Sequence, residues 1–267
     1  ANAVVHTQPA PTTTVVVAPA PAPTPAPTVT VAEPELEGAL PTFFNSGAEA
    51  SLASHCNTVS LVTNTNGGFT TVSSMTDPMV ALNEQFCLAR TYAIARSEEM
   101  IGQLQGVTPQ QVEQQCESFA PAMKDEVAAL SVKTRDEVAQ KVSAFVLGTG
   151  MPPAQLSGTA KICLGVGYRT DNMDVALASG LLLFALGERV YGELMGHHLA
   201  MGFGSTKRPD MSASWYEAAL AASDSGAAAV FVPGQPERND LIRQASTQLG
   251  GAAQPSSAAL PLFNVSE

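Results

Sequence analysis

The sequence predicts a mainly α-helical domain that follows an extended or disordered proline-rich arm. Aromatic residues make up only 6% of the chain, and much of its 45% hydrophobic content is alanine. Such a composition favours closely packed helices over a β-sandwich. Apolar residues recur at helical spacing in successive stretches, and proline and glycine mark where those stretches begin and end. A small β-hairpin near the N-terminal edge of the domain is the one expected exception.

The 267 residues divide into three parts. Residues 1–41 alternate proline with alanine, threonine and valine, a composition that favours extended polyproline II. This arm has two open roles, a spacer or a binding element that adds to a sheet edge or a neighbouring subunit. Residues 42–226 hold the helical domain. Residues 227–267 are expected to form a weakly ordered tail with room for one helix over 236–249.

The chain is expected to be periplasmic or secreted. It begins at Ala1, which fits removal of a signal peptide that ends in small residues, although a trimmed chain would begin in the same way. The net charge of −11 argues against binding to nucleic acid or directly to anionic lipid. No apolar run is long enough to span a bilayer, so no membrane insertion is expected.

Four cysteines predict two disulfides, because an even number is typical of exported chains. They are Cys56, Cys87, Cys116 and Cys163. None forms a C-x-x-C pair, so a zinc or redox site is not indicated. Three connectivities are open, as is the alternative of four buried thiols. A helical hairpin that turns near Gly106 would separate Cys87 from Cys116 by about 10 Å along the helices, which argues against that pair.

The β-hairpin is expected just after the first hydrophobic residues of the domain. Residues 58–63 (TVSLVT) and 69–73 (FTTVS) have the composition of short strands, and Asn66-Gly67-Gly68 between them is typical of a turn. A lone hairpin is marginally stable, so it must pack against helices. Cys56 at its base would hold it there.

Helices follow one another from Thr76 onward. Their expected starts, in order, are Asp77-Pro78, the capping box Thr108–Gln111, Pro121, the capping box Thr134–Glu137, and Pro152-Pro153. Asp171 or Asn172 then caps residues 173–186, which are apolar nearly all round and are expected to form the central buried helix.

Residues 194–222 predict a helical hairpin. Apolar residues recur at helical spacing on both sides of a corner that contains Gly202 and Gly204. These glycines allow the first helix to end and the chain to reverse. Small residues near Trp215 would let the two helices approach closely and seat the indole between them.

This hairpin resembles a Sel1-like repeat, a relative of the tetratricopeptide repeat, over about residues 158–226. The matching positions are Gly196, Gly202, Gly204, Trp215, Tyr216, Ala218 and Ala219. Leu199 stands where the family usually has tyrosine, and Arg208 where it usually has aspartate. An internal echo, Gly165-Val166-Gly167, lies 37 residues before Gly202-Phe203-Gly204. The resemblance implies paired helices and a protein-binding scaffold.

No residue pattern predicts a catalytic, cofactor or metal site. His197 and His198 are adjacent on a helix, point about 100° apart and cannot chelate one ion together. Glu193 shares a face with His197, but two ligands without a third are weak evidence for a metal. The histidines are therefore expected to pack in the core or cap the glycine turn. Serine-nucleophile motifs are missing, and the glycines at 165 and 167 lack the third glycine of a dinucleotide site.

The sequence thus predicts an exported, non-catalytic interaction scaffold of the bacterial cell envelope, without a cofactor. Its expected partner is another envelope protein or copies of itself, and peptidoglycan-associated complexes are among the settings that the resemblance implies. Two alternatives stay open. One is a structural subunit of a periplasmic or extracellular assembly, such as a motor or appendage. The other is a cell-wall hydrolase that uses Glu193.

Overall fold

The computed structural model describes residues 51–252, which fold into helices with no strand among them. The mainly α-helical prediction is confirmed for this part of the chain. The predicted arm over 1–41 lies outside the described residues. In chain order the elements are α1 (Leu52–Thr65), α2 (Pro78–Gly102), α3 (Pro109–Phe119), the short 3-10 helix η1 (Ala120–Met123), α4 (Lys124–Ala129), α5 (Arg135–Thr149), α6 (Pro153–Arg169), α7 (Met173–Ala185), the 3-10 helix η2 (Arg189–Tyr191), α8 (Gly192–Met201), α9 (Pro209–Asp224) and α10 (Glu237–Ala252).

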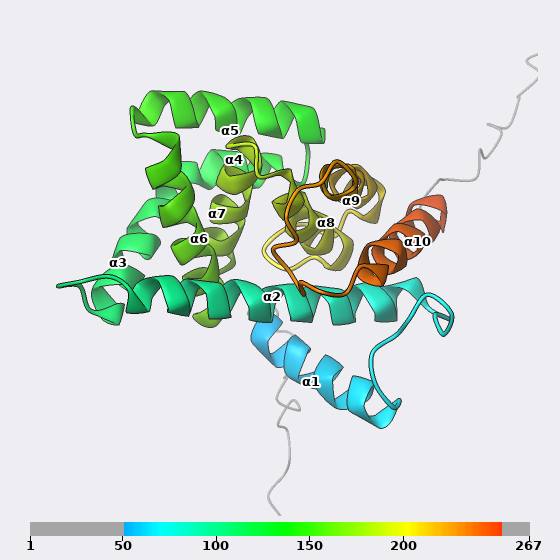
Figure 1. Ribbon diagram of the computed structural model, residues 1–267. Helices are drawn as coiled ribbons and strands as arrows, with labels where there is room; N and C mark the ends of the chain where they lie inside the picture. The colour runs from blue at the N-terminus through cyan, green and yellow to red at the C-terminus, as the bar shows by residue number, and fades with distance from the viewer. Residues whose placement is uncertain (1–50, 253–267) are drawn as a thin grey trace, which may run out of the picture. The chain divides into compact units, whose positions relative to one another are not determined.

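The buried centre is α7, as its apolar sequence predicts. It runs beside α6 and also packs against α4, α5 and α8 (Figure 1). Every residue from Val175 to Phe184 is buried, and the hydroxyl of Ser179 within this run donates to the carbonyl of Val175 at 2.7 Å. Asn172 is the N-cap, since its side chain accepts from the amide of Val175. A helix that is apolar all round can be stable only in such surroundings.

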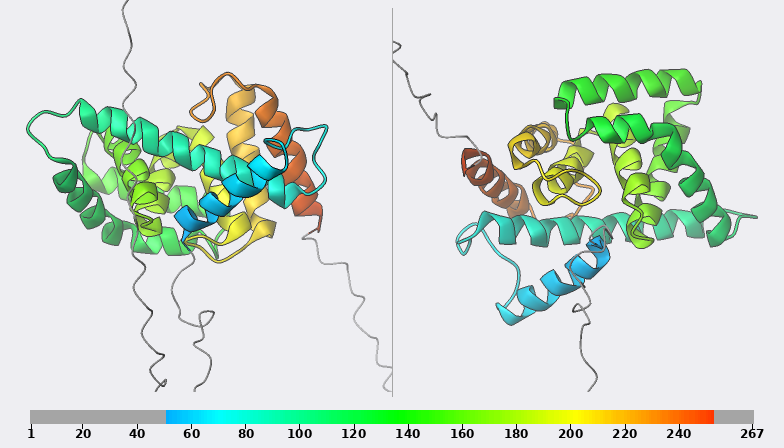
Figure 2. Two further views of the ribbon diagram at one scale, coloured as in Figure 1. Left: turned by 90° about the horizontal axis from the view of Figure 1, so that it is seen from below. Right: turned by 180° about the vertical axis from the view of Figure 1, so that it is seen from behind.

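The longest described helix, α2, extends along the packed helices and contacts α6, α8 and α10 (Figures 1 and 2). It begins as predicted, with Asp77 as N-cap and Pro78 in the first turn. The two expected capping boxes are also present, at Thr108–Gln111 for α3 and Thr134–Glu137 for α5. Each box satisfies amide groups that the first turn of a helix leaves without partners.

The predicted β-hairpin is wrong. Residues 58–63 lie inside α1, and residues 69–73 lie in the turns before α2. The hydroxyl of Thr58 bonds the carbonyl of Ser54, and that of Thr65 bonds the carbonyl of Val62, which is a way for threonine to fit a helix. The residues Asn66-Gly67-Gly68 do form a turn, but this turn follows the end of the helix α1 and does not join two strands. Gly67 has a φ of 87° there.

Contacts with α2 override the strand preference of α1. Leu52, Cys56 and Thr63 form the buried side of α1. Cys56 bonds Cys87 of α2, and the hydroxyl of Thr63 donates to Glu84 of α2 at 2.8 Å. The local β preference of these residues contributes less to stability than the disulfide and the buried apolar face of the helix. The segment therefore forms a helix.

Two disulfides connect the helices, which confirms that prediction. Cys56–Cys87 joins α1 to α2, and Cys116–Cys163 joins α3 to α6. The disfavoured pair, Cys87 with Cys116, does not form. Disulfides of this kind persist in oxidising compartments such as the periplasm or the extracellular space.

Within residues 51–252, none of the helices combines the length and the apolar character that crossing a membrane requires.

Replacing Cys116 and Cys163 together by serine is expected to lower the free energy of unfolding by about 2–4 kcal/mol. The physical reason is that the unfolded chain regains the freedom that closure over a separation of 47 residues removes. Urea unfolding of the variant beside the oxidised protein measures the difference. Equal unfolding midpoints would show that this link adds nothing.

The predicted helical hairpin is formed by α8 and α9. Gly202 ends α8 with φ of 86°, and Gly204 also has positive φ, at 64°. Gly196 lies against the ring of Tyr216, where an added Cβ would come within 2.9 Å of three ring atoms. Trp215 is fully buried, and its ring centroid lies 4.8 Å from that of Phe184 in α7. The indole is thus seated as predicted, with α7 as a third wall.

The internal echo is not a second corner. Gly165 and Gly167 lie inside α6, whereas Gly202 and Gly204 form a turn after a helix. A Cβ on Gly165 would meet the carbonyl oxygen of Ala93 in α2 at 2.5 Å, and one on Gly167 would meet the amide nitrogen of Ala176 in α7 at 2.6 Å. These glycines therefore allow α6 to pack closely against α2 and α7. Their spacing to Gly202 and Gly204 does not mark a repeated turn.

The helical body extends beyond residue 226, where the sequence analysis placed its end. The expected helix near 236–249 is α10, and it packs against α9 and α2. Leu241, Ile242 and Ala245 are buried there. The segment before α10 also buries Phe231.

Candidate functional site

A cluster of polar residues lies buried at the junction of α2, α8, α9 and α10. Glu193 of α8 exposes 7% of its surface, and His197 and His198 expose none. The four-residue spacing places Glu193 and His197 on one face, as the sequence predicts, with 3.3 Å between Oε1 and Nε2. Charged residues are rarely buried unless they are paired, so their partners decide what the cluster can do.

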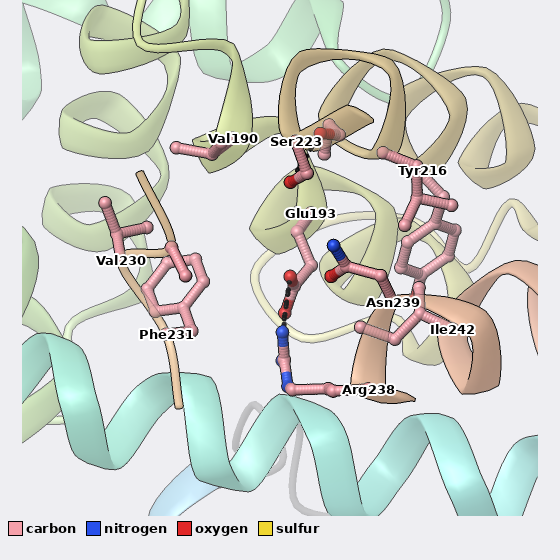
Figure 3. A pocket seen from close by; sticks show the side chains of 12 residues that line it. Val190, Glu193, Tyr216, Ser223, Val230, Phe231, Arg238, Asn239 and Ile242 are labelled. Carbon is pink, nitrogen blue, oxygen red and sulfur yellow. Dashed lines mark hydrogen bonds and ion pairs between the residues drawn. The ribbon is translucent and has the colours of Figure 1, made fainter. Parts of the chain in front are cut away.

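Arg238 from α10 pairs with Glu193. Its Nη1 donates to Oε2 at 2.9 Å and its Nη2 donates to Oε1, so the guanidinium meets the carboxylate through two bonds (Figure 3). Its Nε donates to the side-chain oxygen of Gln85 in α2 at 2.7 Å. Burial by itself would raise the pKa of Glu193, but Arg238 and His197 outweigh it and lower that pKa to about 2. The carboxylate is therefore ionised and fully engaged at neutral pH.

The hydrogen bonds assign one tautomer to each histidine. The ionised Glu193 only accepts, so Nε2 of His197 carries a proton, and Nδ1 accepts from the hydroxyl of Tyr216 at 2.8 Å. His198 donates from Nδ1 to the carbonyl of Phe203 at 2.7 Å, and its Nε2 accepts from the hydroxyl of Tyr168 at 2.9 Å. His198 thus holds the turn between Gly202 and Gly204 through the carbonyl of Phe203. This confirms the expectation that the histidines pack in the core or cap the glycine turn.

Burial keeps both imidazoles neutral. It lowers the pKa of His197, and it lowers the pKa of His198 from 6.5 to about 4. The ring of Phe86 stacks on His197 at a centroid distance of 5.1 Å and meets His198 edge-on at 5.0 Å. A neutral ring is the one that such apolar surroundings tolerate.

Acid is expected to destabilise the protein between pH 6.5 and 4. In that range the unfolded chain protonates His198 while the folded chain cannot, so the free energy of unfolding falls by roughly 3 kcal/mol as the pH drops. The lowered pKa of His197 acts in the same direction. The lowered pKa of Glu193 adds a further loss as the pH falls from 4.5 towards 2.

Urea unfolding at pH 7.5, 5.5 and 4.5 measures this dependence, and the variant His198→Gln, which cannot titrate, should show a shallower slope. A free energy of unfolding that is constant over this range would contradict the assignment of neutral, buried imidazoles.

The cavity beside Glu193 and Arg238 has a volume of about 20 Å³ and is also lined by Tyr216, Phe231 and Ile242 (Figure 3). This is room for about one water molecule. No substrate fits there, and the paired Glu193 has no free proton to give. Among residues 51–252, no group of three His, Cys, Asp or Glu side chains is arranged to hold a metal ion. The arrangement is suited to holding four helices together.

A second candidate site is an apolar groove at the other end of α2, which we call the α3–α5–α6 groove. Its volume is about 390 Å³. Its walls include Leu104, Val107, Phe119, Phe145, Met151 and Leu156. Within the described part of the chain, 51–252, its polar lining residues are the uncharged Gln115, Thr149 and Thr159, and the disulfide Cys116–Cys163 lines it as well.

Apolar side chains are also exposed at this groove. Leu104 is 41% exposed, Val107 38% and Met151 37%, although all three line the cavity. Contiguous exposed apolar surface is typical of interaction sites.

The predicted repeat positions are structural. Trp215, Tyr216 and Ala219 are buried between α8, α9 and their neighbours, and Ala218 packs against the same core. None of the repeat positions lines the α3–α5–α6 groove. Arg238, Gln85 and Tyr168 complete the buried cluster, and none of them was predicted from the sequence. Arg238 lies 45 residues after Glu193, Gln85 lies 108 residues before Glu193, and Tyr168 lies 30 residues before His198. No local spacing in the sequence could therefore reveal them.

No protein-family model, no curated protein and no solved structure matches this chain. The resemblance to Sel1-like repeats therefore stays a prediction that rests on the residues of the α8–α9 hairpin.

Proposed function

We propose that the chain is an exported, non-catalytic interaction scaffold of the bacterial cell envelope, which binds an apolar segment of a partner protein in the α3–α5–α6 groove. The groove is the observation that carries the proposal. The two disulfides support export, because they persist in oxidising compartments.

The chemistry of the groove favours a protein segment over a small polar ligand. Small-molecule sites combine an apolar lining with a few convergent polar groups that orient the ligand. Among residues 51–252, the lining has no charged side chain, and its three polar residues are neutral amide or hydroxyl groups. Three helices around an apolar trough are suited to the apolar face of a partner helix. The disulfide between Cys116 and Cys163 fixes two of those helices in place.

The hydrolase alternative has little support from Glu193. A glycosidase needs two carboxyl groups that converge in a cleft, one of them protonated to act as an acid. Glu193 is ionised and paired with Arg238, and its neighbouring cavity holds about one water molecule. Turnover of cell-wall substrate that disappears in Glu193→Gln, in a variant that still folds, would revive this alternative.

Photo-crosslinking in cells tests the proposed scaffold. A photoreactive residue at Val107, on the edge of the groove, is expected to capture a partner, because the apolar segment would lie within reach. The second substitution Met151→Glu places a charge in the same groove and is expected to reduce the captured product by more than about tenfold, since burying a charge is costly.

The matched control is the same photoreactive residue at Leu61, an equally apolar and more exposed position of α1. Equal capture at both positions, or capture at Val107 that Met151→Glu leaves unchanged, would contradict the proposal. Capture of a second copy of the chain would favour the alternative of a self-assembling structural subunit.

A further inference from the structure

A third cavity, distinct from the α3–α5–α6 groove, opens between α2, α6, η2 and the segment that leads to α10. Its volume is about 410 Å³, within the range of small-molecule sites of about 300–1,000 Å³. We call it the tyrosine cavity and define it by Tyr92, Arg96, Lys161, Tyr191 and Phe231, which line it. None of these residues belongs to the hydrogen-bonded cluster around Glu193.

Aromatic rings form its walls. Tyr191 and Phe231 are both 5% exposed and pack edge to face, with ring centroids 5.6 Å apart. Tyr92 of α2, half-buried, is a third lining ring. Aromatic faces carry partial negative charge and attract the weakly positive C–H groups of a saturated ring.

Among residues 51–252, the hydroxyl of Tyr191 has no hydrogen-bond partner, and it is not one of the unpartnered polar atoms that are sealed from solvent, so solvent reaches it. Because Tyr191 lines the cavity, the hydroxyl opens onto it. Arg96 and Glu188 lie near enough to influence its pKa, which burial raises. Because solvent reaches this hydroxyl, a ligand that bonds it replaces a water molecule and is oriented in the cavity by the new bond.

The charged groups around the cavity are already paired. Arg96 bonds Glu99 of the same helix at 2.6 Å, and Lys161 bonds Glu188 at 2.8 Å. A charged ligand would have to compete with the side chain of like charge in one of these pairs. A neutral hydroxyl group can accept from the cation and donate to the carboxylate of one pair at the same time.

We propose that the tyrosine cavity binds a neutral sugar unit of a glycan. The C–H face of the sugar lies against the half-buried ring of Tyr92. One sugar hydroxyl bonds the hydroxyl of Tyr191, and others bond the Arg96–Glu99 pair. This site goes beyond the proposed scaffold function and does not depend on the α3–α5–α6 groove.

Titration calorimetry of the full chain with three neutral trisaccharides, chitotriose, cellotriose and maltotriose, tests the proposal. At least one is expected to bind saturably at one site, with a dissociation constant of the order of 0.1 mM. Raising the salt concentration should not weaken this binding, because screening acts on charged ligands. Tyr191→Phe removes only the hydroxyl and is expected to weaken binding about tenfold while its thermal unfolding stays close to that of the wild type.

Glu99→Gln breaks the pair with Arg96 and is expected to weaken binding several-fold. The matched control is Asp210→Asn, which breaks the pair Arg208–Asp210, likewise exposed to solvent and 2.6 Å long, and should leave binding unchanged. Three results would overturn the proposal: no saturable binding of any of the three trisaccharides, binding that neither Tyr191→Phe nor Glu99→Gln alters, or binding of trigalacturonate alone that salt abolishes. The last result would show that the cavity selects an anion.

Discussion

Replacing Arg238 by alanine is expected to lower the free energy of unfolding by about 3–5 kcal/mol. The variant leaves Glu193 ionised, buried and without its partner, and it also removes the bond from Nε to Gln85. An uncompensated buried charge costs far more than the pair contributes, because the lone carboxylate keeps the full penalty of leaving water. Urea unfolding at pH 7.5 measures the loss.

Arg243→Ala is the matched control. Arg243 lies on the same helix and bonds Asp224 at 3.0 Å, but both side chains are about half exposed to solvent. An exposed pair of this kind contributes up to about 1 kcal/mol. The double variant Glu193→Leu/Arg238→Met replaces both charges by apolar groups and should recover most of the loss. Similar losses in Arg238→Ala and Arg243→Ala would contradict a buried, interdependent pair.

The substitution Gly165→Ala is expected to destabilise the protein by about 3 kcal/mol. The new Cβ would lie 2.5 Å from the carbonyl oxygen of Ala93 and would also overlap Ser97, so α2 and α6 would have to separate. Overpacking of this kind typically costs about 1–3 kcal/mol and more where backbone must move. The midpoint of thermal unfolding, with calorimetric enthalpies, gives the value.

In the same helix, Gly158→Ala is expected to raise the stability of the protein, in contrast to Gly165→Ala. Its added Cβ would meet nothing within 4 Å. Alanine is the better helix former, so this variant is expected to gain about 0.5–1 kcal/mol. Effects of the same sign at 158 and 165 would show that the closeness of α2 and α6 is not what requires Gly165.

Local signals in the sequence predicted the helices that depend on local physics. The capping boxes at Thr108 and Thr134 satisfy amides within a few residues, so their effect is visible in the sequence alone. The all-round apolar run of α7 could belong only to a buried helix. The glycine corner between α8 and α9 was predictable because positive φ favours glycine.

Signals that act between distant segments were misjudged or missed. The run TVSLVT predicted a strand because its β-branched residues favour one, yet Cys87 and Glu84 of α2 hold it as part of a helix. The partner of Glu193 is Arg238, on a helix that the sequence analysis assigned to a tail. The glycines at 165 and 167 suggested a repeat, but their role is set by helices that pass within contact distance.

Neither candidate binding site could be derived from the sequence, for the same reason. The α3–α5–α6 groove combines residues from Leu104 to Cys163, and the tyrosine cavity combines residues from Tyr92 to Pro233. Each of these residues has an ordinary explanation as core or surface when it is considered alone. Only the tertiary packing of the helices and their connecting segments brings them together.

Hydrogen–deuterium exchange of the chain, free and in complex with the partner captured at Val107, tests the central claim most directly. Exchange is expected to slow in α3 and in the C-terminal half of α5, which border the α3–α5–α6 groove, while α1 and α9 exchange at the same rate in both states. Slowed exchange confined to α1 or α9, with α3 and α5 unchanged, would contradict the proposal that this groove is where the protein binds its partner.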